Sequence, residues 1–224
     1  MSRIQGAVLK DLLSGTDAAR ASAETLGAGA MLLRGFALQE AKAIVKAVER
    51  VAVEAPFRHM ITPGGYRMSV GMTNCGRAGW ITDQRGYRYD PLDPMTQRPW
   101  PAMPPIVHRL ATRAAEAVGF AGFAPDACLI NRYEPGARLT LHQDKNERDF
   151  TQPIVSVSLG LPAVFLFGGA RRTDRPRRIT LESGDVVVWG GVARMAFHGI
   201  DKVADGDDPL TGSCRINLTL RKAL

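Results

Sequence analysis

Cysteine is scarce in this sequence, with three residues in 224, at Cys75, Cys128 and Cys214, and no CxxC spacing. That scatter argues against a disulfide framework or a zinc knuckle, and it predicts three buried, small hydrophobic side chains in a reducing compartment. Long apolar runs are also missing, since no window approaches the roughly 20 apolar residues of a membrane span. The N-terminal stretch MSRIQGAVLKDLLSG has no secretory apolar core. We therefore expect a cytoplasmic protein with no membrane partner.

Charge of one sign is only slightly in excess. Hydrophobic residues make up 45% of the chain and charged residues 23%, as in ordinary globular proteins. The 29 Lys and Arg residues exceed the 22 Asp and Glu residues, which gives a net charge of +7. This is a modest bias toward polyanions such as nucleic acid, and many basic proteins bind none. Nothing in the sequence demands more than a monomer.

Two helices are expected in the first half of the chain. Apolar residues recur at helical spacing over residues 38–55. A second helix is expected over residues 104–120, with prolines at its start and Gly119 as a stop signal. The segment between them, about 56–104, is rich in Gly, Pro and aromatic residues and reads as short strands and loops.

From Cys128 onward, turn signals separate eight short β-rich runs: ACLINRY, RLTLH, PIVSVSLG, AVFLFGG, RRITLES, DVVVWGG, RMAFHGI and SCRINLTLRK. This spacing favours a jelly roll over βαβ units. We expect one mainly β domain over residues 1–224, with flanking helices and a jelly-roll core over about 126–222.

His142 and Asp144 stand two positions apart in LHQDK, in a chain with only four histidines. On a strand the two would point to the same side and Gln143 to the other. Imidazole and carboxylate suit a divalent metal, and His198 is the candidate third ligand of a facial site with open positions, as in non-haem Fe(II) oxygenases. The alternative is a strand end with an exposed ion pair, because so short a motif also occurs by chance.

Polar and apolar residues alternate in SCRINLTLRK, so one face carries Arg215, Asn217, Thr219 and Arg221. A solvated outer face would give the same alternation. If the face points inward, its two guanidiniums require anionic partners, and a small dicarboxylate would serve both. Asn131 and Tyr133 share a face of ACLINRY and would either complete such a site or form a polar rim.

Six segments place these residues in a common context: TPGGYRMSVGMTNCGRAGW, PWPAMP, DACLINRYEPGARLTLHQDK, PIVSVSLGLPAVFLFGG, GDVVVWGG and CRINLTLR. In order and spacing, from about Met31 to Arg221, they resemble the AlkB family of Fe(II)- and 2-oxoglutarate-dependent dioxygenases, which oxidatively demethylate alkylated DNA and RNA bases. The resemblance implies a double-stranded β-helix (jelly roll) core with N-terminal helical support, and a nucleotide-recognition lid over about 56–104.

The resemblance also implies roles for individual residues. Fe(II) would be held by His142, Asp144 and His198. 2-Oxoglutarate would be bound at its distal carboxylate by Tyr133, Arg215 and Asn217, and near its keto end by Asn131 and Arg221. A flipped base would lie between Trp80 and His142, because aromatic faces replace the stacking that a base loses on extraction. The nucleotide, its phosphates and the lid would involve Thr62, Tyr66, Met68, Met72, Tyr87, Lys145 and Arg172. The implied partner is single-stranded DNA with alkylated bases, with double-stranded DNA and RNA left open.

One position departs from the family pattern. Where relatives carry an acidic residue two positions after the metal-binding aspartate, this chain has Asn146. A carboxylate there would favour cationic lesions such as 1-methyladenine and 3-methylcytosine, whereas asparagine offers an acceptor without net charge. We therefore predict weaker discrimination between cationic lesions and neutral ones such as ethenoadenine.

Several further residues are given structural roles. His59 is expected in a loop and His108 on a helix surface, neither as a metal ligand. Trp189 is expected in the core close to the metal, and Trp100 as the anchor of a loop. The run RRTDRPRR, residues 171–178, either neutralises phosphates or is a solvated hairpin loop.

Three other functions remain open at this point. The same iron site would serve a 2-oxoglutarate oxygenase of a protein or a small molecule, and competition by single-stranded DNA would separate the two. A non-catalytic binder of alkylated nucleic acid would bind no Fe(II) or form no succinate. A cupin-type metal hydrolase is a weaker alternative, because it has no need of Arg215 and Arg221 beside the metal.

Overall fold

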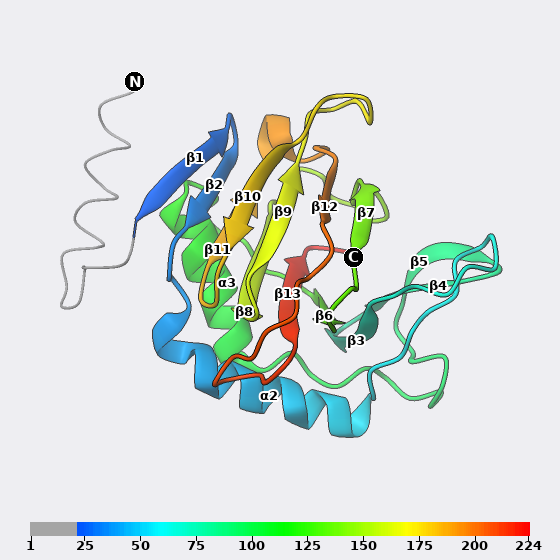
Figure 1. Ribbon diagram of the computed structural model, residues 1–224. Helices are drawn as coiled ribbons and strands as arrows, with labels where there is room; N and C mark the ends of the chain where they lie inside the picture. Colours follow the sequence, from blue (N-terminus) through cyan, green and yellow to red (C-terminus); the bar gives the residue numbers. More distant parts are fainter. Residues whose placement is uncertain (1–21) are drawn as a thin grey trace.

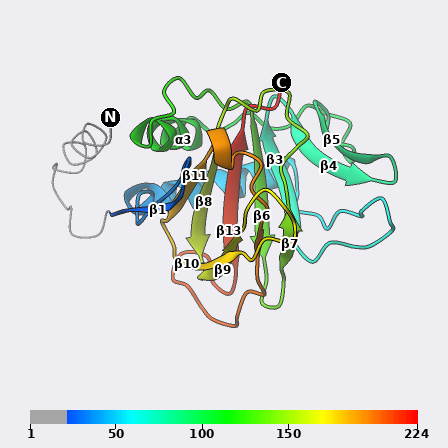
Figure 2. The ribbon, with the colours of Figure 1, turned by 90° about the horizontal axis from the view of Figure 1, so that it is seen from above.

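The computed structural model describes residues 22–224, and residues 1–21, which the single-domain expectation includes, lie outside the described residues. Two antiparallel sheets stack face to face in a jelly roll, with two helices against one of them (Figures 1 and 2). The mainly β prediction is thus confirmed. No helix within the described part of the chain is long and apolar enough to cross a membrane.

Seven strands form the major sheet, in the spatial order β1 (Ala23–Gly27), β2 (Ala30–Leu33), β11 (Val186–Trp189), β8 (Ile154–Gly160), β13 (Arg215–Arg221), β6 (Ala127–Tyr133) and β3 (Gly71–Gly76). The minor sheet has the order β10 (Arg177–Leu181), β9 (Ala163–Phe167), β12 (His198–Ile200) and β7 (Leu139–His142). All eight β-rich runs expected after Cys128 contain a strand, and each strand pairs with at least one neighbour in one of the two sheets.

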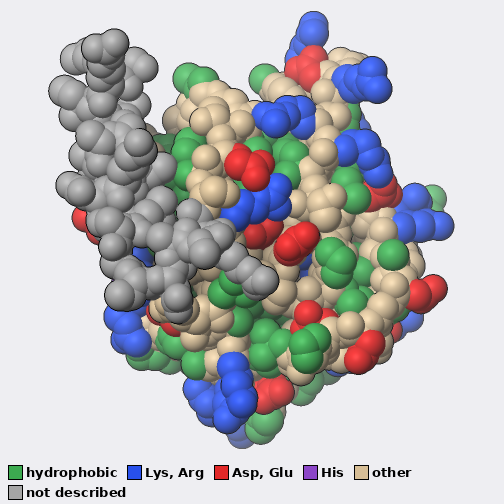
Figure 3. Space-filling view, turned by 60° about the vertical axis from the view of Figure 1, so that its left-hand side comes forward, with side chains coloured by type: hydrophobic (Ala, Val, Ile, Leu, Met, Phe, Trp, Pro, Cys, Tyr) green, Lys and Arg blue, Asp and Glu red, His purple; other side chains and the backbone are tan. Residues whose placement is uncertain are grey.

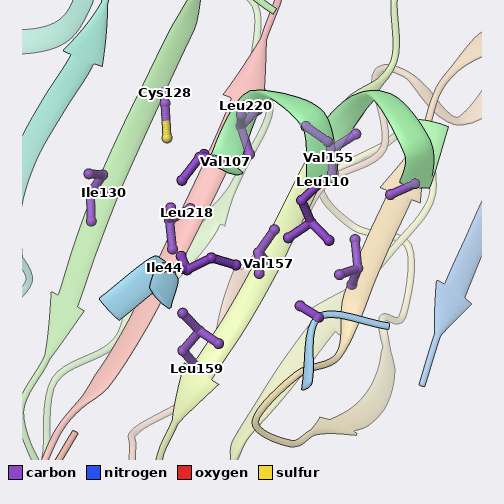
Figure 4. Close-up of a cluster of buried hydrophobic side chains, with 14 of the residues drawn as sticks. Ile44, Val107, Leu110, Cys128, Ile130, Val155, Val157, Leu159, Leu218 and Leu220 are labelled. Carbon is purple, nitrogen blue, oxygen red and sulfur yellow. The ribbon is translucent and has the colours of Figure 1, made fainter. Parts of the chain in front are cut away.

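The helices α2 (Ala41–Glu54) and α3 (Pro105–Ala117) cover the outer face of the major sheet. Their apolar stripes pack against the apolar side chains that the strands present on this outer face, as Figure 4 shows for Ile44, Leu110, Val157 and Leu218. The expected start at residue 38 is a 3-10 turn, η1 (Leu38–Glu40), and the α-helix begins at Ala41. A second 3-10 turn, η2 (Gly191–Ala193), follows β11.

The segment 56–104, expected to be lid and loops, divides between two places. Its strand β3 belongs to the major sheet, where Met72 lies opposite Asn131 of β6. Only β4 (Gly79–Asp83) and β5 (Gly86–Asp90) form a separate two-stranded hairpin, which stands beyond β3 at one edge of the molecule (Figures 1 and 2). We call residues 79–90 the recognition hairpin.

The sequence patterns missed β1 and β2, which extend the other edge of the major sheet. β1 is mostly exposed, so it lacks the apolar alternation that reveals a half-buried strand. The expectations that the cysteines are buried and that Trp100 anchors a loop are confirmed. The three thiols are free and buried, and the buried Trp100 ring donates its Nε1–H to the Asp90 carbonyl.

Candidate active site

Two histidines lie side by side on neighbouring strands of the minor sheet. His142 of β7 lies opposite His198 of β12, and their ring centroids are 4.4 Å apart. Asp144 completes the group, with Oδ1 3.7 Å from His142 Nε2 and Oδ2 3.8 Å from His198 Nε2. One donor atom from each of the three residues lies within 4.8 Å of the others, so they could hold a single metal ion.

Backbone contacts orient both imidazoles. The Nδ1 atom of His142 is 2.9 Å from the Thr140 carbonyl, and that of His198 is 3.0 Å from the Ala196 carbonyl. Since a carbonyl only accepts, Nδ1 carries the proton in each ring and Nε2 offers its lone pair to the centre of the group. Gly199 lets the strands approach, because a Cβ there would lie 2.6 Å from the Leu139 carbonyl oxygen.

The His–x–Asp pair does not lie on one strand, contrary to the expectation. β7 ends at His142, so Asp144 lies in the following loop and not on the strand. Gln143 lines the cavity described below and donates from Nε2 to the Met195 carbonyl at 2.6 Å. The aspartate is placed instead by Arg194, which donates from Nη1 to its carbonyl at 2.9 Å, and by a guanidinium from β13.

Charge around Asp144 keeps its carboxylate ionised. Burial alone would raise the pKa of Asp144, but the Arg221 guanidinium and the two imidazoles hold it well below its usual range. Arg221 donates from Nη2 to Oδ2 at 2.6 Å. Burial and the neighbouring His142 lower the pKa of His198 to about 4, so its imidazole is neutral near pH 7.

The polar face of β13 points inward, and a solvated outer face is therefore excluded, because all seven residues of the strand are buried. Asn217 donates to Ser156 Oγ at 2.8 Å and accepts from Thr219. Arg221 already has acidic partners within the chain, Asp144 and Glu147, so it does not need an external anion.

Arg215 is different. Its side chain is fully buried and donates to Ser158 Oγ at 2.7 Å, but Nε and Nη1 have no hydrogen-bond partner in the described structure. No acidic residue among those described forms an ion pair with it. Burial lowers its pKa only to about 10, so the guanidinium stays charged at neutral pH with two donors free. Such a group fits a bound carboxylate.

A cavity of about 500 Å³ lies between the sheets and opens under the recognition hairpin. Fifteen of the seventeen predicted site residues line it: Thr62, Met68, Met72, Trp80, Tyr87, Asn131, Tyr133, His142, Asp144, Lys145, Asn146, Arg172, His198, Asn217 and Arg221. Most of the residues predicted from the sequence, although far apart in the chain, therefore line one continuous cavity.

Two predicted residues do not line the cavity. Arg215 lies behind the wall, opposite Tyr133 on the neighbouring strand. Tyr66 is 78% exposed on a tight turn in which Thr62 Oγ1 accepts its backbone N–H, so it could contact a nucleotide only outside the cavity. Met72 lines the cavity from β3 of the major sheet, and it is therefore part of the floor and not of the lid.

Aromatic and amide groups shape the mouth of the cavity. Trp80 and Tyr87, on the two strands of the recognition hairpin, stack with ring centroids 5.6 Å apart. Asn146 bridges the strands, since Oδ1 accepts from Trp80 Nε1 at 3.2 Å and Nδ2 donates to the Tyr87 carbonyl at 3.3 Å. Arg172 donates to the Leu141 carbonyl beside them.

Sequence reasoning missed several residues of the site. Phe165, Phe197 and Ser156 line the cavity, and the buried Glu147 and Arg194 pair beneath the metal-ligand loop at 3.0 Å. Ser156 could have been found, because serines alternate with apolar residues in IVSVSLG. Glu147 could not, because it lies in an irregular loop without periodicity. Trp189 lies where expected, 4.9 Å from the His198 ring between centroids.

The arginine run 171–178 does not form a uniform basic surface. Arg171 pairs with Asp174 at 3.0 Å, and Arg178 pairs with Asp201 at 2.6 Å. On the face shown in Figure 3, basic and acidic side chains are interspersed. Of this run, only Arg172 lines the cavity.

Known proteins are similar to this chain in sequence and in fold. Residues 29–221 match the family model described as 2OG-Fe(II) oxygenase superfamily. The chain is 58% identical over 200 residues to the alpha-ketoglutarate-dependent dioxygenase AlkB of Escherichia coli. The aligned region covers 89% of this chain and 93% of that protein. It is 48% identical over 183 residues to the AlkB homolog of Caulobacter vibrioides, with 81% of each chain covered.

A solved structure, that of OsALKBH1, superposes with a TM-score of 0.79 at 28% identity, over 90% of this chain and all of that one. The donor set fits what these relatives require, because two imidazoles and one carboxylate suit Fe(II) and the buried Arg215 suits a carboxylate of 2-oxoglutarate. The protein therefore belongs to the AlkB family and is a dioxygenase that uses Fe(II), 2-oxoglutarate and dioxygen.

Proposed function

We propose that this enzyme oxidatively demethylates N-alkylated bases, such as 1-methyladenine and 3-methylcytosine, in DNA and preferentially in single strands. One observation carries the proposal. A single cavity of about 500 Å³ runs from the His142, Asp144 and His198 group to the stacked Trp80 and Tyr87 rings on an exposed hairpin. That volume suits a ligand of nucleobase size, and the rings suit its faces.

His142, Asp144 and His198 would hold Fe(II), and Tyr133, Arg215 and Asn217 would bind the distal carboxylate of 2-oxoglutarate. Asn131 and Arg221 would lie near its keto end. When bound, these groups supply an oxidation that converts 2-oxoglutarate and dioxygen to succinate and carbon dioxide and hydroxylates the N-methyl group, which then leaves as formaldehyde.

The protein contributes orientation and exclusion of water. Apolar walls from Leu129, Phe165 and Trp189 limit the space beside the metal group. Trp80 and His142 would hold the extracted base between their rings, so that its alkyl group points toward the metal. Extraction costs least from a single strand, which is the physical basis of the proposed strand preference.

Cationic side chains beside the mouth would contact the strand. Lys145 and Arg172 are exposed and line the cavity, and phosphates would lie against them, with Thr62 and Tyr66 along the nucleotide. DNA is the proposed partner, with RNA as an alternative substrate. We further propose that the enzyme acts as a monomer in the cytoplasm.

The lesion range is proposed to include neutral etheno adducts. Asp144 is the one carboxylate that lines the cavity in the described structure, and Arg221 pairs with it. Asn146, beside the Trp80 ring, offers amide groups without charge. A cationic base would therefore gain little electrostatic advantage over a neutral one of similar shape.

The test is mass spectrometry of a single-stranded oligonucleotide with one 1-methyladenine, incubated with the enzyme, Fe(II), ascorbate and 2-oxoglutarate. Loss of one methyl mass that requires both 2-oxoglutarate and His142, by comparison with His142→Ala, supports the proposal. Succinate formation without methyl loss, for 1-methyladenine and etheno substrates alike, would point to a protein or small-molecule substrate. Oligonucleotide binding without succinate would indicate a non-catalytic binder.

A further inference from the structure

A buried carboxylate lies just behind the metal-ligand loop. Glu147 follows Asn146 in sequence, and its side chain is only 1% exposed. It does not line the cavity, and no role in metal or co-substrate binding accounts for it. A buried charge is costly unless it is paired and hydrogen-bonded, so its partners indicate what it does.

Glu147 joins three elements that are separate in the chain. Tyr89 of the recognition hairpin donates its hydroxyl to Oε1 at 2.6 Å. Arg194, beside η2, donates to Oε2 at 3.0 Å. Arg221 of β13 places Nε 3.5 Å from Oε1 and donates to Asp144 as well. Two guanidiniums and two carboxylates thus form one buried, charge-balanced network.

Tyr89 is the part of this network that belongs to the recognition hairpin. It lies directly opposite Trp80 in the β4–β5 register, so it shares a backbone rung with the proposed base-stacking residue. Burial raises the pKa of the Tyr89 hydroxyl well above its usual range, so it remains a donor to the carboxylate.

We propose that Glu147 and Tyr89 are positioning residues that tie the recognition hairpin to Asp144 through Arg221, so that the placement of the base-binding rings and the metal site are linked. The connection runs from Tyr89 to Glu147, from Glu147 to Arg221 and from Arg221 to Asp144, without an exposed group along it. The inference rests on the proposed metal-binding role of Asp144 and on the proposed role of the hairpin in binding bases.

The physical reason is competition for one guanidinium. Arg221 is shared between Asp144 and Glu147, and Tyr89 provides one of the hydrogen bonds that hold Glu147 in place. If Tyr89 moves away with the hairpin, Glu147 loses a hydrogen-bond donor. Its carboxylate then interacts more strongly with the Arg221 guanidinium. Asp144 then loses part of the interaction that orients its carboxylate. Linkage requires that metal binding, in turn, restrains the hairpin.

The experiment compares Tyr89→Phe and Glu147→Gln with Glu134→Gln, a matched control that removes a carboxylate 64% exposed on the surface. Two quantities are measured without turnover. The first is the dissociation constant of Mn(II), from electron paramagnetic resonance of the free ion. The second is amide hydrogen exchange of residues 79–90 with and without saturating Mn(II). Thermal unfolding checks that each variant is folded.

Tyr89→Phe is expected to weaken Mn(II) binding by about five- to tenfold, although it lies on another element. Mn(II) is expected to slow exchange in the hairpin of the native enzyme and of Glu134→Gln, but not of Glu147→Gln. If Tyr89→Phe accelerates hairpin exchange and leaves Mn(II) affinity within about twofold, the hairpin is anchored but not linked, and the proposal fails. Loss of Mn(II) affinity in Glu147→Gln alone would also overturn it, because the effect would then be local. Failure of the native enzyme to bind Mn(II) would instead remove the proposed metal site itself.

Discussion

Replacing Arg215 with methionine should separate 2-oxoglutarate binding from folding. The side chain is fully buried, makes one hydrogen bond to Ser158 and leaves Nε and Nη1 without partners among the described residues. Methionine keeps much of the volume and removes the charge. If the guanidinium binds the distal carboxylate, Arg215→Met should lose two charge-assisted hydrogen bonds, about 3–6 kcal/mol in total. That corresponds to a roughly 10²- to 10⁴-fold weaker affinity for 2-oxoglutarate.

The same substitution should not destabilise the unliganded enzyme. Burial lowers the pKa of Arg215 to about 10, so keeping it charged at neutral pH costs the folded state about 3 kcal/mol. Methionine removes that cost and loses the bond to Ser158, worth about 1 kcal/mol. The net gain of about 2 kcal/mol should therefore raise the midpoint of thermal unfolding by about 4–8 °C.

The assay is calorimetric titration of 2-oxoglutarate into the Mn(II)-loaded enzyme without oxygen, beside thermal unfolding with and without the ligand. Arg132→Met is the matched control, because Arg132 lies on the neighbouring strand, is 46% exposed and pairs with Glu134 on the surface. An unchanged dissociation constant in Arg215→Met would refute the carboxylate role. A loss of unliganded stability would refute the description of Arg215 as a buried cation without an acidic partner.

Three further predictions concern the mouth of the cavity and the core. Trp80→Ala should weaken binding of a single-stranded oligonucleotide by about 1–3 kcal/mol, because one stacking face is lost, and fluorescence anisotropy would show it; an unchanged affinity would exclude stacking by Trp80. Asn146→Asp should raise the ratio of 1-methyladenine to ethenoadenine turnover at least roughly fivefold, since a nearby negative charge is worth about 1 kcal/mol or more to a cationic base; a constant ratio in competition assays would contradict this. Ile44→Ala should lower the free energy of unfolding by about 2–5 kcal/mol in urea titrations, because Ile44 is fully buried between α2 and the major sheet, while leaving 2-oxoglutarate affinity unchanged.

Much of the site could be predicted because its residues lie on regular strands. The alternation in RINLTLR places Arg215, Asn217 and Arg221 on one face whatever the partner strands are, since successive side chains of a strand point to opposite sides. The apolar spacing of residues 41–51 similarly defines the face of α2 that is buried. Such periodicity is local and can be read without knowing what packs against it.

Irregular segments could not be predicted in the same way. The loop after β7 has no period, so the strand rule placed Asp144 on a strand that already ends at His142, and it gave no role to Glu147. β3 also read as part of a loop-rich segment, and only its pairing with β6 assigns it to the major sheet.

The sequence by itself determined which side chains share a face and which residue types could form a facial metal site and bind a carboxylate. Only the tertiary structure decided their partners. Arg221 pairs with Asp144 and Glu147, whereas Arg215 has two donors without partners among the described residues. Tyr89 donates to the buried carboxylate of Glu147, which is 58 residues away in sequence. The reason is physical, because a strand's alternation depends on backbone geometry alone, whereas the pairing of buried charges depends on how distant segments pack.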